Sequence, residues 1–228
     1  MERNNKKTFK KVEQKTGVGI MTFTTLLGDS IIDNKSYVQH GEFSVLEHLE
    51  HQSDYEFQQL AYDGHTTENV LTGQILSPAV QTSSHLVLSV GGNNLLYKIP
   101  FLHEGPIENI NMAIAGVQQY IFKPLQQRYE TIVEKLSSHR ANLLLCTVYE
   151  GDLRRSDEFS GVIDSSKTMV SAFNDIVYKT AKKYGADVLE LRNIFTSSED
   201  YANPIEPSHI GGEKFAKAII KWVEVNET

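Results

Sequence analysis

Short apolar runs alternate along the chain with longer stretches in which apolar residues recur every three or four positions. The runs predict buried strands and the longer stretches predict helices packed through one face. Strands are expected at residues 21–27, 55–62, 85–90, 142–149 and 187–191. Helices are expected at about 44–51, 67–76, 107–138 with a break near Pro124, 165–184 and 212–225. This order predicts an α/β fold, a five-stranded parallel sheet between two layers of helices.

Composition places the chain among single-domain globular proteins. It has 228 residues, of which 40% are apolar and 22% charged, and no apolar run is long enough for a transmembrane segment. Residues 1–20 carry six Lys or Arg and two Glu, which predicts a flexible basic arm before one domain at 21–228. Subtracting the arm's +4 from the net charge of −7 leaves −11 on that domain. Such a charge argues against nucleic acid as a partner of the domain.

Cysteine usage and the first residues bear on the cellular compartment. Cys146 is the only cysteine, so an intramolecular disulfide is impossible, and it lies in an apolar run that predicts an inert core thiol. Residues 1–20 lack the apolar core of a secretory signal. We therefore expect a cytoplasmic protein, although export by a signal-independent route stays open.

The first predicted strand ends abruptly at Gly28-Asp29-Ser30. Small polar residues at the carboxyl end of a parallel strand stand where open α/β sheets present ligands. Ser30 is accordingly a candidate nucleophile, which needs a base within hydrogen-bond reach and donors for the oxyanion. Taken alone, Ser30 fits the cap of a following helix equally well.

Three further blocks follow this one in order. Gly64 lies in DGHTTENVL, Asn93 lies in GGNN after a predicted strand, and YANPIEPSHIGGEKFA precedes the last predicted helix. Together with Gly28-Asp29-Ser30 they resemble the four blocks of the SGNH hydrolases, also called the GDSL esterase and lipase family. No Walker P-loop, G-x-S-x-G elbow or H-E-x-x-H motif competes with this interpretation.

The resemblance implies a flavodoxin-like three-layer α/β/α sandwich and a serine esterase that works through an acyl-enzyme on Ser30. It implies an oxyanion hole made by the backbone amides of Ser30 and Gly64 and the side chain of Asn93. The substrate would be an ester of a small molecule, lipid or carbohydrate, and no metal or organic cofactor is implied. The oligomeric state is left open.

The fourth block departs from the family pattern D-x-x-H and allows two alignments. In the first, Glu206-Pro207-Ser208-His209 keeps the spacing, so His209 is the base and Glu206 orients it. In the second, the frequent continuation H-P-S-x-x-G falls on residues 206–211, so Glu206 replaces the histidine and Asn203 the aspartate. The second alignment keeps more flanking residues.

Imidazole chemistry favours the first alignment, because an unperturbed histidine titrates near neutral pH whereas a glutamate must be buried to become an equally strong base. We therefore expect Ser30, His209 and Glu206 to form the catalytic set. Two alternatives stay open: a binding or scaffolding module that has lost its base, and an acyltransferase.

Overall fold

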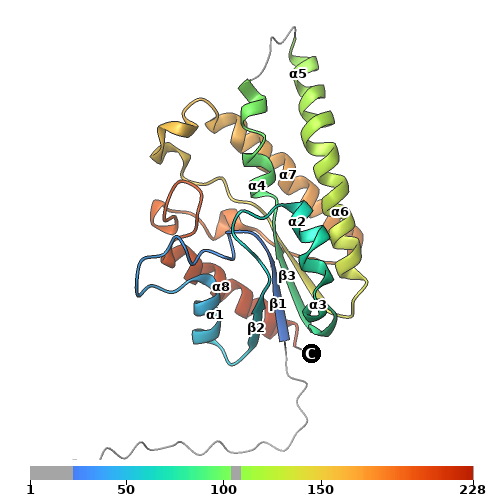
Figure 1. The fold of residues 1–228 in the computed structure, drawn as a ribbon, viewed down its shortest axis with the longest axis vertical. Helices are drawn as coiled ribbons and strands as arrows, with labels where there is room; N and C mark the ends of the chain where they lie inside the picture. The colour runs from blue at the N-terminus through green and yellow to red at the C-terminus, as the bar shows by residue number, and fades with distance from the viewer. Residues whose placement is uncertain (1–22, 104–108, 228) are drawn as a thin grey trace, which may run out of the picture.

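The computed structural model describes residues 23–103 and 109–227. Five parallel strands form one sheet in the order β2-β1-β3-β4-β5. Helices cover both faces of this sheet (Figure 1). The predicted three-layer α/β/α fold is therefore confirmed, and its strand order is the flavodoxin-like one. The proposed basic arm lies outside the described residues.

All five strands occur where the apolar runs predict them. Four of them are shorter than expected, and the expected start of the first, residues 21–22, lies outside the described residues. Their bounds are β1 Phe23–Gly28, β2 Glu56–Gln59, β3 His85–Ser89, β4 Asn142–Cys146 and β5 Asp187–Leu189.

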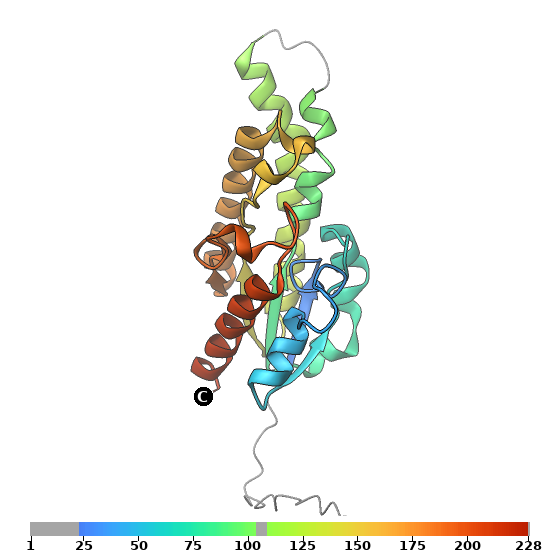
Figure 2. The same ribbon diagram turned by 90° about the vertical axis from the view of Figure 1, so that its left-hand side faces the viewer.

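Side chains of the central strands point alternately into two cores. Leu27, Leu86 and Leu145 face one core, and their neighbours Leu26 and Val87 face the other. The first core is closed by α2, α6 and α7 and the second by α1 and α8. Figure 2 looks onto the second layer, with α1 and α8 in front of the strands. Burial on both faces explains why these strands are continuous apolar runs in the sequence.

The longer helices follow the predicted pattern. They are α1 Val45–Gln52, α2 Thr67–Thr72, α5 Ile110–Val117, α6 Lys123–Ser137, α7 Ile163–Tyr184 and α8 His209–Val225. Two short helices were not predicted, α3 Pro78–Thr82 and α4 Gly92–Leu96, because five residues are too few to show a helical period. Helix α2 ends earlier than expected, at Gly73, and a 3₁₀ turn follows it.

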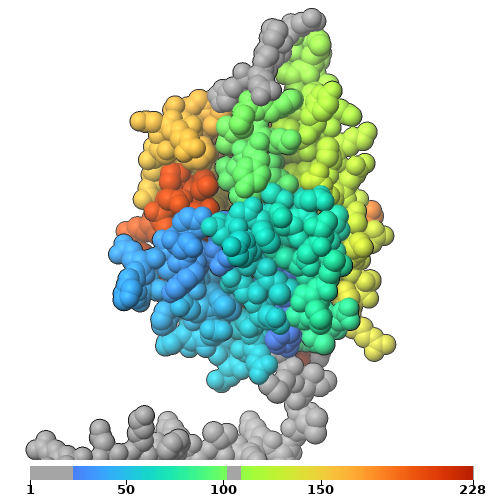
Figure 3. Space-filling view, viewed as in Figure 1, coloured from blue at the N-terminus to red at the C-terminus, as the bar shows by residue number. Residues whose placement is uncertain are grey.

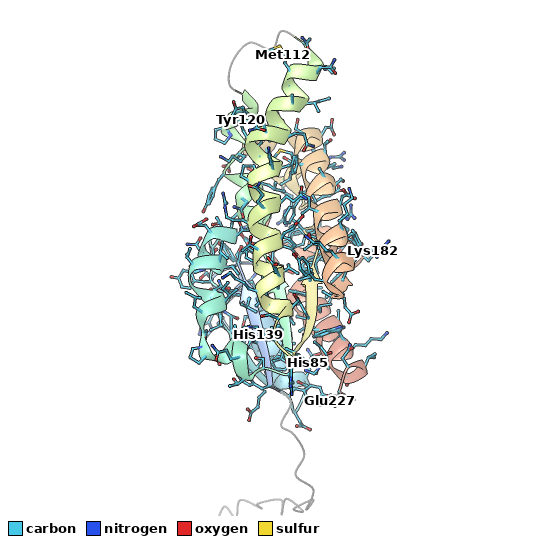
Figure 4. All side chains as sticks on the ribbon, turned by 90° about the vertical axis from the view of Figure 1, so that its right-hand side faces the viewer. His85, Met112, Tyr120, His139, Lys182 and Glu227 are labelled. Atoms are coloured by element: carbon cyan, nitrogen blue, oxygen red, sulfur yellow. The ribbon has the colours of Figure 1, made fainter. Side chains whose placement is uncertain are left out.

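The expected break near Pro124 is absent. A π-helical turn, Gln118–Phe122, instead joins α5 to α6 in one continuous helix. The wider turn accommodates the proline ring and its missing N–H, which would otherwise interrupt α-helical bonding. Figure 4 shows the result as a long helix with Met112 near its free end.

The end of the last helix is tied to the amino-terminal edge of the sheet. His85, the first residue of β3, lies 3.3 Å through Nε2 from the carbonyl oxygen of Asn226. Figure 4 shows His85 beside Glu227 at this edge. The opposite edge, where the strands end, is left for the loops that follow them. None of the described helices has the length and apolar character needed to cross a bilayer.

Helix α8 packs closely enough to forbid a methyl group at Gly211. A Cβ there would lie 2.2 Å from the Asp200 carbonyl oxygen, whereas a Cβ at Gly116 in α5 would meet nothing within 4 Å. We expect Gly211→Ala to destabilise the protein by about 2 kcal/mol or more, because backbone must move. Gly116→Ala should stabilise it by up to about 1 kcal/mol, through helix propensity. Urea unfolding measures both, and equal effects would contradict the packing described for α8.

Candidate active site

The turn that carries Ser30 is built on close backbone contact between β1 and β3. Gly28 has φ +140°, and a Cβ there would lie 1.8 Å from the carbonyl oxygen of Ser89. That same oxygen accepts a 3.1 Å hydrogen bond from the Asp29 N–H. The buried Gln74 side chain accepts from the Gly28 N–H at 2.7 Å and donates to the Gly28 carbonyl at 2.8 Å. Ser30 therefore leaves the sheet at the point where strand order reverses, as the sequence predicted.

Glu206 and Ser30 line the same cavity. The Glu206 side chain is 6% exposed. Burial raises the pKa of Glu206 to about 7, against the lowering effect of the nearby Ser30 hydroxyl, and the negative charge of Asp63 adds to the rise. One carboxylate oxygen, Oε2, is buried and has no hydrogen-bond partner in the described structure.

His209 is held elsewhere. It is the first residue of α8, whose N-cap Ser208 accepts from the Gly211 N–H through its hydroxyl. The His209 Nδ1 lies 3.0 Å from His48 Nε2, and the two rings stack with centroids 4.8 Å apart. This placement differs from the expected triad, because the helix begins at His209 and directs its ring onto α1. The geometry matches the second alignment, with Glu206 at the serine.

His48 lies between α1 and α8. Its side chain is 3% exposed and lies against His209 of α8. Burial lowers the pKa of His48, and the charge of His209 lowers it further. Within residues 23–103 and 109–227, no group of His, Cys, Asp and Glu side chains is arranged to hold a metal ion.

The strap that presents Glu206, residues 201–207, is fixed through its main chain. Asn203 Oδ1 accepts from the N–H groups of Ile205 and Glu206, each at 2.9 Å. The Tyr149 hydroxyl donates to the Ile205 carbonyl at 2.6 Å. In the second alignment Asn203 takes the place of the aspartate, and in the structure its side chain bonds the backbone of Glu206 instead of orienting an imidazole.

A buried asparagine, Asn34, joins this strap to the segment that follows the Ser30 turn. The Asn34 carboxamide donates to the Pro207 carbonyl at 3.2 Å and accepts from the Val45 N–H at 2.8 Å. Sequence reasoning missed Asn34 and Gln74, because a single amide in a loop carries no pattern that reveals burial. Their roles become visible only once the turn and the strap lie side by side.

The candidate oxyanion donors come from two neighbouring loops. Asn93 donates one side-chain N–H to the His65 carbonyl at 2.9 Å, which ties Asn93 to the loop that contains Gly64. The second side-chain N–H of Asn93 remains available for an oxyanion. Asn93 lines a cavity with Ser30 and Glu206, whereas Gly64, at φ +78°, is not among the lining residues. Asn94 has a structural role, since its Oδ1 accepts from the Thr67 N–H at 3.0 Å at the start of α2.

The cavity beside Ser30 has a volume of about 70 Å³ and is mainly apolar. Figure 3 shows the segments around residues 30, 95 and 205, in blue, green and red, meeting on one face of the molecule. The apolar lining comes from the α4 region, the loop after β4, α7 and the strap, and includes Leu95, Leu96, Ile99, Val148, Tyr149, Leu153, Met169, Val170 and Ile205. Tyr149 reaches this lining from the loop after β4. Tyr201 lines a separate, polar pocket.

Comparison with known proteins gives matches at the level of fold. No protein-family model matches the sequence, and no curated protein sequence matches it. Solved structures do match. Phospholipase A1 from Streptomyces albidoflavus has a TM-score of 0.65 and 15% identity over 88% of this chain and 99% of that one. A member of the lipolytic G-D-S-L family from Veillonella parvula has 0.62 and 16%, over 88% and 97%. A variant of the acetylxylan esterase Axe2 from Geobacillus stearothermophilus has 0.61 and 11%, over 88% and 93%. The chain therefore has the SGNH hydrolase fold.

Asp29 generates a prediction about stability. Its side chain is 1% exposed, and burial raises its pKa from 3.8 to about 8, against hydrogen bonds from the Ile31 and Gly91 N–H groups. The folded protein therefore keeps a proton that the unfolded chain releases above about pH 4, so stability falls as pH rises toward 8. Asp29→Asn should be more stable than wild type at pH 8 by a few kcal/mol, with the gap closing near pH 4. Urea titrations across this range measure the difference, and a gap independent of pH would contradict the buried neutral carboxyl.

Proposed function

We propose that the protein hydrolyses carboxylic esters through an acyl-enzyme on Ser30, with Glu206 as the general base. The observation that carries this proposal is that one cavity brings together a nearly buried serine hydroxyl and a carboxyl group whose pKa burial has raised to about 7. Such a pKa matches a base that must work near neutral pH. The solved structures of similar fold, named for phospholipase and acetylxylan esterase activity, support an ester as the substrate.

The proposed reaction passes two protons through Glu206, one in each half. As Ser30 Oγ attacks the ester carbonyl carbon, ionised Glu206 takes the hydroxyl proton, and it then gives that proton to the departing alkoxide, which leaves as the alcohol. Asn93 Nδ2 and the backbone amides of Ser30 and Gly64 would hold the negative oxygen of the tetrahedral intermediate. Water then attacks the acyl-enzyme, Glu206 accepts a proton from that water, and the released Ser30 oxygen takes up this second proton.

The raised pKa of Glu206 removes the diagnostic value of a simple pH profile. A rise in rate through a group near pH 7 would follow from this glutamate as well as from a histidine. The identity of the base therefore has to be read from variants. No histidine is among the residues that line the described cavity. This also favours a second candidate, a binding module that retains the pocket without turnover.

The first functional prediction compares Ser30→Ala, Glu206→Gln and His209→Ala on one short activated ester. Members of a catalytic set act as a unit, so the first two changes should each lower kcat by 10³-fold or more, as order-of-magnitude figures. His209→Ala should stay within about tenfold of wild type, because its ring packs on His48. Circular dichroism checks folding. A severe loss in His209→Ala with mild loss in Glu206→Gln would restore the first alignment. No turnover on an ester panel and no labelling by a serine-directed phosphonate would leave the binding module.

The second functional prediction concerns the oxyanion hole. Asn93→Ala should lower kcat by roughly 100- to 1000-fold with a smaller effect on KM, because its donor acts on charge present in the transition state. Asn94→Ala is the matched control. It should lose stability, since it caps α2, but keep most of its kcat. Equal losses of kcat in the two variants would mean that the third block has been assigned to the wrong residue.

A further inference from the structure

The cavity beside Ser30 contains a polar atom that the proposed reaction does not use. Ser166, on α7, lines the cavity, and its Oγ is buried without a hydrogen-bond partner in the described structure. The other unpartnered oxygens at this cavity, Asp29 Oδ2 and Glu206 Oε2, belong to the nucleophile turn and the base. Ser166 comes from a different element and shares its wall with Met169 and Val170.

The state of this hydroxyl is unusual for a helix. A serine or threonine in a helix can bond the carbonyl oxygen four residues earlier, as Thr168 does with Asp164 at 3.0 Å two residues further along α7. The Val162 carbonyl accepts from the Ser166 N–H at 2.7 Å, but the structure gives no such bond to Ser166 Oγ. Leaving a buried hydroxyl unpaired among apolar side chains costs stability, which a polar atom of a ligand would recover.

The lining of the cavity limits what that ligand is. It is otherwise aliphatic around Ser166, with Leu95, Leu153 and Met169 among the contacts available to a chain. An acyl chain suits such a lining, and a polar atom on that chain would satisfy Ser166.

We propose that the cavity selects an acyl group bearing a hydroxyl or oxo oxygen, and that Ser166 determines this selectivity by hydrogen bonding to that oxygen. The inference rests on the proposed ester hydrolysis and specifies its acyl class. A serine hydroxyl both donates and accepts, so it recognises either oxygen. A site built to bond a polar group discriminates against an analogue that lacks it, since the protein's own group is then left unpaired.

The test compares matched aryl esters of butyrate, 3-hydroxybutyrate and acetoacetate. Wild type should have a kcat/KM about tenfold higher for at least one oxygenated ester than for butyrate, the effect of one hydrogen bond. Ser166→Ala should remove that preference. Ser165→Ala, the same change one residue away at an exposed position, should keep it. If Ser166→Ala does not fold, Ser166→Cys replaces it in the same comparison of esters.

Binding of the neutral amides of the same acids, followed by NMR titration, separates this inference from the hydrolysis itself. Tighter binding of 3-hydroxybutyramide or acetoacetamide than of butyramide, lost in Ser166→Ala, would support the pocket even if no ester were hydrolysed. Ester turnover without an oxygen preference, or a preference that survives Ser166→Ala, would overturn the role of Ser166. Absence of both turnover and amide binding would overturn the inference together with the proposed function.

Discussion

The contact between Gly28 and the Ser89 carbonyl is the constraint on which the site depends. No side chain fits between these two strands at this point, and the same carbonyl receives the Asp29 N–H, so the chain must turn out of the sheet here. The Gln74 side chain fixes the turn by hydrogen bonds to the backbone N–H and the carbonyl oxygen of Gly28. With two anchors on adjacent residues, Ser30 is held by backbone geometry. Its position owes little to its own side chain.

The second half of the site is held in the same way. Glu206 is presented by a strap whose amides are satisfied by Asn203 and whose carbonyls are bonded by Tyr149 and Asn34. In the usual family arrangement a carboxylate orients an imidazole through a side-chain hydrogen bond. Here orientation comes from the main chain, and the electrostatic adjustment comes from burial and from nearby acidic groups. Orientation by the main chain suits the proposed carboxylate base, because a second carboxylate used to orient it would repel its negative charge.

The sequence was sufficient for the sheet and for the position of the turn that carries Ser30. Both are local patterns: apolar runs buried on two faces, and a glycine followed by polar residues at a strand end. It was insufficient for the choice between Glu206 and His209, because three residues of spacing do not reveal where a helix starts. Ser208 caps α8 and sends the His209 ring to His48, a partner far away in the sequence. Ser166 escaped notice for a similar reason, since an unpaired hydroxyl is a property of packing.

Ser30 and Glu206 come from opposite ends of the described chain. Ser30 follows the first strand, whereas Glu206 follows the last strand and stands just before α8, which packs against α1. Parallel sheets form through contacts between distant segments, so their folding is slow to complete. During synthesis the turn that carries Ser30 would leave the ribosome long before the strap that carries Glu206. If Glu206 is the base, as proposed, a chain that ends before the strap would lack it, and reactivity at Ser30 would be a late marker of the finished fold.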